Sequence, residues 1–331
     1  MRLLLTGGAG FIGCNFVRHV LAEREDMRVR VLDKLTYAGS LENLAEVSEH
    51  PRFEFVEGDV CDLEAVGSAL EGVDAVVHMA AESHVDRSII SAEAAVDTNF
   101  VGTFTMLEAA REAGIERFLH VSTDEVYGAC LGEPFAEQDP LNPRNPYSAS
   151  KAGADRLAYS YFITYELPVV IARPSNNYGP FQYPEKLIPF FVYRALNDEH
   201  LPVYGDGMQV RDWLQVGDDC RGLMVLLERG EPGEAYNIHG GNERPNLETI
   251  RLILDELGKP DSLIKHVEDR PGHDVRYSMD ASKMRALGWE PEVPWEQGIR
   301  DTVRWFAEHR EWMERSVARG RQYFEQWYAG R

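Results

Sequence analysis

Two adjacent carboxylates and a hydroxyl in the middle of the chain have the residue types needed for acid–base chemistry. Thr123, Asp124 and Glu125 follow one another directly and come after the apolar run Arg117–Val121. Such a run is typical of a buried parallel strand, and open α/β sheets bind ligands beyond the carboxyl ends of these strands. We therefore expect the three side chains to line a ligand crevice, although Asp124 and Glu125 alone would also suit a solvated turn.

A tyrosine and a lysine farther along the chain are one helical turn apart. Tyr147 and Lys151 follow Pro146, a residue favoured in the first turn of a helix. Their spacing places both side chains on one helix face. An ammonium beside a phenol lowers the phenol pKa, so we expect Tyr147 to act as a base toward a substrate hydroxyl. An ordinary amphipathic pair is the alternative interpretation.

The chain starts with a glycine-rich turn between a strand and a helix. Arg2–Thr6 predicts a short buried strand, and Gly7, Gly10 and Gly13 follow it. The glycines permit a tight turn, close approach of a pyrophosphate and close packing of helix on strand. Because the helix N-terminus also offers free N–H groups to phosphates, this segment predicts a dinucleotide site.

A carboxylate after the second strand indicates which dinucleotide to expect. Asp33 ends the strand pattern at 29–32 and lies 20 residues after Gly13, where an acidic residue bonds the adenosine ribose hydroxyls. Since this carboxylate would repel a 2′-phosphate, we expect NAD as the cofactor. Lys34, next to it, keeps NADP open as the alternative.

Strand and helix patterns continue to alternate, with further buried strands expected at 53–56, 75–79, 169–172 and 236–238. Asp59 is placed to reach the adenine amine or to cap the helix that follows it, and the two roles are compatible. Ala80 and Ala81 are small enough for a nicotinamide–ribose to pack on their backbone. The polar loop at 82–88 is suited to lining a site.

This alternation predicts a Rossmann-type α/β fold with a doubly wound parallel sheet. We expect segments 1–172 and 213–240 to form the NAD-binding domain. The composition changes after the strand at 169–172 to loops, tryptophans and isolated basic groups. Segments 173–212 and 241–331 are therefore expected to form a smaller, mixed α/β lobe that binds the substrate.

Composition excludes several classes of partner and compartment. The 331 residues include 34 Lys+Arg against 55 Asp+Glu, a formal net charge of -21 that would repel nucleic acid. The four cysteines are far apart and form no metal-ligand or disulfide pattern, so we expect no metal site and a reducing cytoplasm. The first strand begins at once and no apolar run approaches about 18 residues, so we expect neither a signal peptide nor a membrane span.

Two helices are candidates for a subunit contact. A helix from near Asn99 to Ala113 and another from near Tyr147 each carry apolar residues beyond those that one core face requires. We therefore expect a second apolar face on this pair of helices. A homodimer would bury it.

Longer stretches of the sequence narrow the choice of protein family. Residues 6–13 (TGGAGFIG), together with Tyr147 and Lys151, resemble the extended short-chain dehydrogenase/reductase superfamily. Seven further strings resemble the dTDP-glucose 4,6-dehydratases within it: 33–39 (DKLTYAG), 80–88 (AAESHVDRS), 122–128 (STDEVYG), 175–180 (SNNYGP), 184–189 (PEKLIP), 211–213 (RDW) and 270–274 (RPGHD). The resemblance runs from the first strand to the last helix.

The resemblance implies a carbon–oxygen lyase of deoxysugar biosynthesis that converts dTDP-glucose to dTDP-4-keto-6-deoxyglucose with NAD as cofactor. It would oxidise C4, eliminate water across C5 and C6, and return the hydride to C6. The resemblance implies that Tyr147 takes the O4 proton, Thr123 bonds that hydroxyl and Lys151 orients the nicotinamide ribose. Asp124 would be the general acid for the departing C6 hydroxyl, and Glu125 the general base at C5.

The same resemblance and the motifs above give two sets of binding residues. Cofactor-binding positions are expected at Gly7, Gly10, Phe11, Ile12, Gly13, Asp33, Lys34, Thr36, Asp59, Val60, Ala80, Ala81, Ser83, Thr98, Tyr147, Lys151 and Asn177. Substrate-binding positions are expected at Glu82, Ser83, His84, Thr123, Asn176, Lys186, Leu187, Pro202, Tyr204, Arg211, Asn246, Arg270 and His273. Lys186 and Arg211 supply basic groups for a pyrophosphate, although either alone would also suit a surface ion pair.

The chemistry itself calls for these residue types. Oxidation at C4 acidifies the C5 proton, which Glu125 can remove, while Asp124 must be protonated to help water leave from C6. Two adjacent carboxylates in a shielded site repel each other, so one of them is expected to hold a proton near neutral pH.

Four other functions remain open from the sequence. The first is a 4,6-dehydratase of another nucleotide sugar, such as UDP-glucose, because the resemblance alone indicates thymidine. A nucleotide-sugar 4-epimerase would need Tyr147 and Lys151 but not the two carboxylates, and a decarboxylase of a nucleotide-linked glucuronate would favour a basic group in place of Asp124. A non-enzymatic NAD-binding regulator would need none of these acid–base residues.

Overall fold

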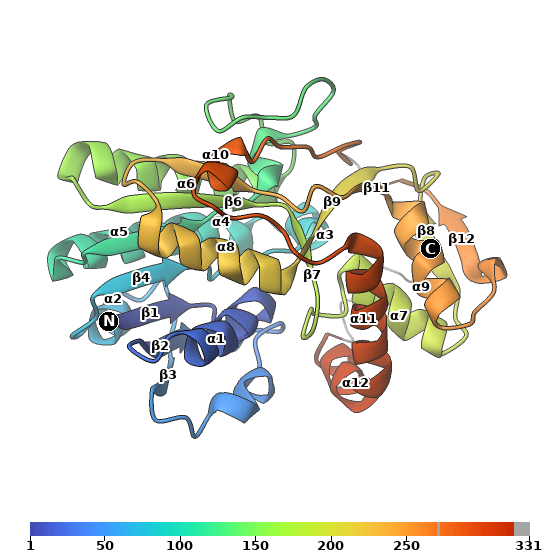
Figure 1. The fold of residues 1–331 in the computed structure, drawn as a ribbon, viewed down its shortest axis with the longest axis horizontal. Helices are drawn as coiled ribbons and strands as arrows, with labels where there is room; N and C mark the ends of the chain where they lie inside the picture. Colours follow the sequence, from blue (N-terminus) through green and yellow to red (C-terminus); the bar gives the residue numbers. More distant parts are fainter. Residues whose placement is uncertain (270–271, 321–331) are drawn as a thin grey trace.

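The computed structural model describes residues 1–269 and 272–320, and its main feature is a seven-stranded parallel sheet (Figure 1). Its strand order is β10-β6-β5-β4-β1-β2-β3. The strands are β1 (Arg2–Thr6), β2 (Arg28–Asp33), β3 (Phe53–Glu57), β4 (Ala75–His78), β5 (Arg117–Val121), β6 (Val169–Pro174) and β10 (Ala235–Ile238). The fold class predicted from the sequence is confirmed.

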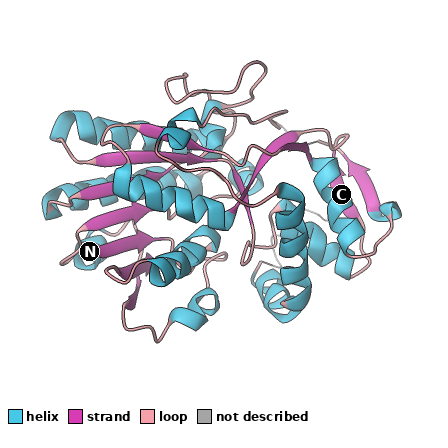
Figure 2. Cartoon of the chain, viewed as in Figure 1, coloured by secondary structure: helices cyan, strands magenta, loops and turns pink. Residues whose placement is uncertain are grey.

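Helices cover both faces of this sheet (Figure 2). One face packs against α1 (Phe11–Glu23) and α8 (Val216–Arg229), and the other against α2 (Leu63–Ala69), α5 (Gly102–Ala113) and α6 (Pro146–Tyr165). Side chains alternate between the two cores along each strand: Leu3 and Leu5 lie in the first, whereas Leu4 lies in the second. This burial on both faces explains why the strands read as continuous apolar runs.

A smaller lobe lies beside the carboxyl ends of the sheet strands (Figure 1). It contains a three-stranded sheet, β11 (Glu243–Pro245), β9 (Val210–Gln215) and β7 (Asn176–Tyr178), and a strand pair, β8 (Leu201–Tyr204) with β12 (Ile264–Val267). Its helices are α7 (Leu187–Leu196), α9 (Asn246–Glu256), α11 (Trp295–Glu308) and α12 (Arg310–Arg319), which share a separate apolar core.

Short elements complete the chain: η1 (Leu41–Val47), α3 (Val85–Ile90), α4 (Glu93–Val96), η2 (Asp97–Val101), η3 (Asp124–Tyr127), η4 (Asp261–Leu263) and α10 (Ser282–Ala286). The helix expected from Asn99 begins differently, because η2 is a π-helical turn and the regular helix α5 starts at Gly102. Among the described residues, no helix combines the length and apolar character that crossing a bilayer requires.

The sheet and α6 bring the two chemical segments together. The strand order reverses at β1, which lies between β2 and β4, and such reversals open a crevice at the carboxyl edge. The turn η3 follows β5 at this edge. Pro146 and an Asn145–Ser148 capping box fix the start of α6, so Tyr147 stands in the first helical turn beside η3.

Two histidines lie next to each other within the sheet, behind this crevice. His78 of β4 and His120 of β5 are register partners, and both are buried. His78 bonds Thr6 Oγ1 at 2.8 Å and Thr103 Oγ1 at 2.9 Å, whereas neither ring nitrogen of His120 has a partner among the described residues. Burial, with the nearby Lys151 ammonium, lowers the pKa of His78 to about 3 and that of His120 well below its ordinary value.

This pair predicts a loss of stability in mild acid. Both rings stay neutral in the folded chain but protonate near pH 6.5 when it unfolds, so their contribution is present above about pH 6.5 and is lost as the pH falls below that value. When the pH falls from about 7.5 to about 5.5, the free energy of unfolding should decrease in both proteins. The decrease should be about 1 kcal/mol smaller in His120→Leu than in the wild type. Urea unfolding at the two pH values measures this, with His200→Leu, at an exposed histidine, as control. Equal losses in His120→Leu and the wild type would contradict it.

Candidate active site

The glycine loop after β1 leaves no room for side chains at two of its positions. Gly7 has a φ of +74°, and a Cβ on it would lie 2.8 Å from Ala80 Cα. A Cβ on Gly13 would lie 2.6 Å from Gly8 Cα. The N-cap of α1 is Gly10, which has no side chain to bond the free N–H groups of the first turn. The loop and helix end therefore fit a pyrophosphate.

Asp33 is fixed at the end of β2 by the backbone on either side of it. Its carboxylate accepts hydrogen bonds from Ala9 N and Leu35 N, both at 2.9 Å, and burial raises its pKa. Lys34 forms an ion pair with Asp59 at 2.5 Å. Because Asp59 already compensates the lysine charge, the Asp33 carboxylate in this cavity would disfavour a 2′-phosphate.

The proposed capping role of Asp59 is wrong. The N-cap of α2 is Asp62, whose carboxylate accepts from Glu64 N at 2.9 Å. Asp59 instead accepts from Cys61 N at 3.0 Å and holds Lys34. In the sequence both aspartates precede the same helix, so spacing alone could not separate them.

One cavity of about 290 Å³ at the carboxyl edge gathers the predicted cofactor positions. It is lined by Gly7, Gly10, Phe11, Ile12, Gly13, Asp33, Lys34, Thr36, Asp59, Val60, Ala80, Ala81, Ser83, Thr98, Tyr147, Lys151 and Asn177. Thr123, Asp124 and Glu125 line it too. Asn177 Oδ1 and Ser122 Oγ are buried there with no partner among the described residues, as expected of groups that meet a ligand. The residues present thus fit a bound dinucleotide.

Short contacts join the end of β5 to α6. Lys151 Nζ donates to Val121 O at 2.7 Å. Thr123 is the N-cap of η3: its Oγ1 accepts from Glu125 N at 3.3 Å and donates to Asp124 Oδ1 at 3.1 Å. The hydroxyl, the two carboxylates and the lysine are therefore held at one strand end.

The two adjacent carboxylates differ in environment. Asp124 is buried, and burial followed by the negative charge of Glu125 raises its pKa well above the ordinary value. This shift favours the protonated form of Asp124, the direction expected for one member of the pair. Glu125 borders both this cavity and the next one, and its Oε2 accepts from Asn145 Nδ2 at 3.5 Å.

The expectation that Lys151 lowers the pKa of Tyr147 is wrong for the protein without ligands. Burial, and then the charge of Glu125, raise the pKa of Tyr147, and a hydrogen bond with Thr123 opposes this rise. The Lys151 ammonium bonds the Val121 carbonyl and not the phenol. A cationic nicotinamide in the adjoining space would lower the pKa of Tyr147.

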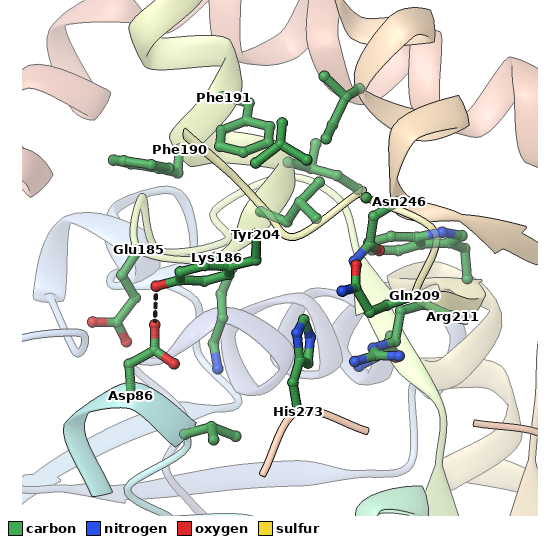
Figure 3. Close-up of a pocket in the computed structure, with 18 of the residues that line it drawn as sticks. Asp86, Glu185, Lys186, Phe190, Phe191, Tyr204, Gln209, Arg211, Asn246 and His273 are labelled. Atoms are coloured by element: carbon green, nitrogen blue, oxygen red, sulfur yellow. Dashed lines mark hydrogen bonds between the residues drawn. The ribbon is translucent and has the colours of Figure 1, made fainter. Parts of the chain in front are cut away.

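A second cavity, of about 190 Å³, lies between the sheet and the smaller lobe (Figure 3). Of the predicted substrate positions, His84, Asn176, Lys186, Leu187, Pro202, Tyr204, Arg211, Asn246 and His273 line it. Glu82, Ser83 and Thr123 line the first cavity instead, because they lie on the sheet side of the crevice. Arg270 lies outside the described residues. The cavities share Glu125, Asn176, Asn177, Gln182, Glu185 and Lys186, so they form one continuous site.

The side chains that line this second cavity are suited to binding an anion. Arg211 donates to Val210 O at 2.7 Å and to Asp274 O at 3.0 Å, and its guanidinium lies 4.3 Å from the centre of the Tyr277 ring. No carboxylate of the described residues is within ion-pair distance of it. Lys186 Nζ, which donates to Ser83 O at 2.5 Å, adds a second positive charge. Two cations facing one cavity of an acidic protein favour a pyrophosphate.

Sequence reasoning missed a group that connects the two cavities. Glu185, which lines both, pairs with Arg87 at 2.8 Å and accepts from Tyr37 OH at 3.0 Å. The Arg87 guanidinium also stacks on the Tyr37 ring, 3.7 Å from its centre. All three residues occur in the strings that carried the resemblance, but their spacing in sequence gave no sign that they meet. Asp86, another missed residue, accepts from Tyr204 OH at 3.1 Å.

Comparison with known proteins supports this reading of the site. Low-salt glycan biosynthesis protein Agl12 of Haloferax volcanii is 55% identical over 92% of this chain and 98% of its own length. A dTDP-glucose 4,6-dehydratase of Actinoplanes is 50% identical over 94% of this chain and 99% of its own. The dTDP-glucose 4,6-dehydratase DesIV of Streptomyces venezuelae, solved with NAD bound, is 51% identical, with a TM-score of 0.93 over 96% of this chain and 100% of that one.

The resemblance found in the sequence is thereby confirmed. A UDP-glucose 4-epimerase of Thermus thermophilus is a more distant neighbour, 33% identical with a TM-score of 0.86 over 93% of this chain and 99% of that one. Residues 4–302 match the family described as GDP-mannose 4,6 dehydratase, and the chain belongs to that family.

Proposed function

We propose that the protein catalyses the 4,6-dehydration of dTDP-glucose with NAD as a resident cofactor. The observation that carries this proposal is the Asp124–Glu125 pair, which lines the first cavity together with Tyr147 and Lys151, with Glu125 also bordering the second. The relatives that are dTDP-glucose 4,6-dehydratases, including one solved with NAD, support it.

Tyr147 and Thr123 serve the first half of the reaction. NAD⁺, when bound, would supply the oxidant for sugar C4 and would return the hydride to C6 while Glu125 returns a proton to C5, so that the redox cycle closes. Tyr147 Oη takes the O4 proton, and Thr123 Oγ1 bonds the same hydroxyl and holds it in place. Lys151, fixed to the Val121 carbonyl, would orient the nicotinamide ribose.

Asp124 and Glu125 serve the elimination. The C4 ketone acidifies the C5 proton, and Glu125 removes it. Asp124, protonated because it is buried beside a carboxylate, donates its proton to the departing C6 hydroxyl so that water leaves. Arg211 and Lys186 bind the pyrophosphate on the far side of the sugar.

The same fold also supports epimerases, as the Thermus thermophilus neighbour shows. A 4-epimerase needs no acid–base pair at C5 and C6, so the Asp124–Glu125 pair favours the dehydratase. The preference for thymidine rests on the relatives. Incubation with dTDP-, UDP- and GDP-glucose, followed by the absorbance of the 4-keto product in base, tests both points: turnover of dTDP-glucose is expected to be fastest, and 4-epimer formation would overturn the proposal.

Substitutions of the acid–base residues should separate the steps. Tyr147→Phe should lose C4 oxidation, whereas Glu125→Gln should still oxidise C4 but fail to remove the C5 proton, so that reduced dinucleotide accumulates. Asp124→Asn should oxidise C4 and expel water slowly. Each loss should be about 10²–10⁴-fold in the affected step. Stopped-flow absorbance and incorporation of solvent deuterium at C5 measure the steps; near wild-type turnover by Glu125→Gln would refute the assignment.

The cofactor should co-purify with the protein. Denaturing the purified protein and running the supernatant by chromatography should release NAD; NADP as the main species would contradict the role of Asp33. Gly13→Ala should carry far less NAD, because its Cβ would collide with the loop backbone. Gly67→Ala is the matched control, since a Cβ there meets nothing within 4 Å, and it should retain NAD.

We further propose a homodimer formed through η2, α5 and α6. Several apolar side chains on these elements are exposed, namely Phe100, Val101, Phe104, Tyr159, Ile163 and Tyr165. They lie on three elements that contact one another, so together they are suited to serve as an interface. Two copies of these helices, related by a two-fold axis, would bury it.

This interface predicts the effect of one charge on assembly. Phe104, 47% exposed, should tolerate a change to Glu in a monomer but not in the dimer, because a buried unpaired carboxylate is costly. Light scattering should therefore find wild type dimeric and Phe104→Glu monomeric at micromolar concentration. Leu131→Glu, at an 85% exposed leucine in a loop, is the control and should stay dimeric. A monomeric wild type would count against the dimer.

We also propose a reducing, cytoplasmic location and a division of the chain into two units. All four cysteines are free, and burial raises the pKa of Cys14 to about 12, so this thiol resists oxidation. The units proposed are 1–172 with 213–240, which include the large sheet except the last two residues of β6, and 173–212 with 241–331.

A further inference from the structure

A buried arginine on β6 touches both segments that carry the proposed chemistry. Arg173 is 1% exposed. Its Nε and Nη2 donate to the two carboxylate oxygens of Asp155 on α6, at 2.8 and 2.9 Å. Its Nη1 donates to the Tyr127 hydroxyl, at the end of η3, at 2.5 Å. A single side chain therefore bridges the helix of Tyr147 and Lys151 to the turn of Asp124 and Glu125.

The bridge is rigid, because each of its groups is buried and has further partners. Tyr127 is 1% exposed, its hydroxyl donates to Asn237 Oδ1 at 2.8 Å, and its ring stacks on Phe135 at 5.1 Å. Asp155 is fully buried; although burial raises its pKa, Arg173 lowers it to about 2, so the pair is ionised. Bidentate pairing of this kind fixes direction as well as distance.

The two ends of η3 are held in different ways. At its start, Thr123 follows Ser122, whose N–H donates to Ala172 O of β6 at 2.7 Å, so the sheet fixes this end. At its end, Asn142 N donates to Val126 O at 2.9 Å, and the Tyr127 hydroxyl is the side-chain anchor, beside an apolar cluster of Val126, Tyr127, Ala152 and Met279. Asp124 and Glu125 lie between these ends, so release of the Tyr127 end would move the carboxylates more than Tyr147, which α6 holds separately.

We propose that Tyr127, held by Arg173, is a positioning residue that sets the place of the Asp124–Glu125 pair relative to Tyr147 and Lys151. The proposal rests on the dehydratase function inferred above and deepens it. Neither residue touches the substrate; both act through the turn that carries the acid and the base. A displacement of about 1 Å of a catalytic group can cost about 10²-fold in rate, so an anchor at this point has a measurable effect.

Kinetics of Tyr127→Phe test the proposal by separating the two halves of the reaction. In single turnovers with dTDP-glucose, elimination should slow about 10- to 10²-fold while C4 oxidation changes much less, so reduced dinucleotide accumulates. Arg173→Lys, which keeps the charge but cannot reach Asp155 and Tyr127 together, should show the same imbalance. Tyr161→Phe is the matched control: it removes a tyrosine hydroxyl on α6 that donates to Glu108 at 2.5 Å, and both steps should stay at the wild-type ratio.

Amide hydrogen exchange gives a second readout that needs no turnover. Residues 124–128 should exchange faster in Tyr127→Phe and Arg173→Lys than in the wild type, with α6 unchanged. Wild-type exchange at 124–128, or equal slowing of oxidation and elimination, would overturn the positioning role. Failure of the wild type itself to convert dTDP-glucose would instead refute the proposed function, and the exchange result would still decide whether Tyr127 anchors the turn.

Discussion

The hydrogen bond from the Lys151 ammonium to the Val121 carbonyl is the contact on which the site depends. It fastens the helix that carries Tyr147 to the strand that delivers Thr123, Asp124 and Glu125. The ammonium is buried, and burial lowers its pKa to about 8, while the charge of Asp155 opposes this fall. A buried cation persists only where the surrounding charges compensate it, and here the ionised Asp155, itself held by Arg173, lies one turn farther along the same helix.

At Asp124 and Glu125 the unfavourable charge is negative, and a proton on one of the two carboxylates relieves their repulsion. Asp124 and Glu125 are adjacent, and in a protein of net charge -21 no general excess of positive charge is available to separate them. Burial therefore favours the protonated form of Asp124, which is the state that an acid catalyst needs. At the far end of the site, the Arg211 guanidinium has no carboxylate partner among the described residues. One end of the crevice, at Asp124, is thus suited to donating a proton, and the other, at Arg211, to binding an anion.

Local sequence patterns were sufficient to predict the sheet, the glycine loop and the position of Asp33 at the end of β2, because each depends on residues close together in the chain. Local patterns did not correctly predict the capping role of Asp59 or the pKa of Tyr147. Which aspartate caps α2 depends on where the helix begins, to within one turn. The pKa of Tyr147 depends on burial and on the charge of Glu125, whereas Lys151 bonds the Val121 carbonyl. The Arg87–Glu185–Tyr37 contact and the Arg173 bridge join segments distant in sequence, so no spacing rule could reveal them. The π-helical turn η2 before α5 likewise depends on packing, so the local sequence pattern did not predict it.

The fate of the hydrogen on sugar C4 tests the central claim most directly. If the protein oxidises C4, eliminates water and reduces C6 within one site, dTDP-glucose labelled with deuterium at C4 should yield a 4-keto-6-deoxy product with that deuterium at C6 and solvent hydrogen at C5. Mass spectrometry and NMR of the product locate both atoms. Deuterium retained at C4 of a sugar with inverted configuration would contradict the account and indicate an epimerase.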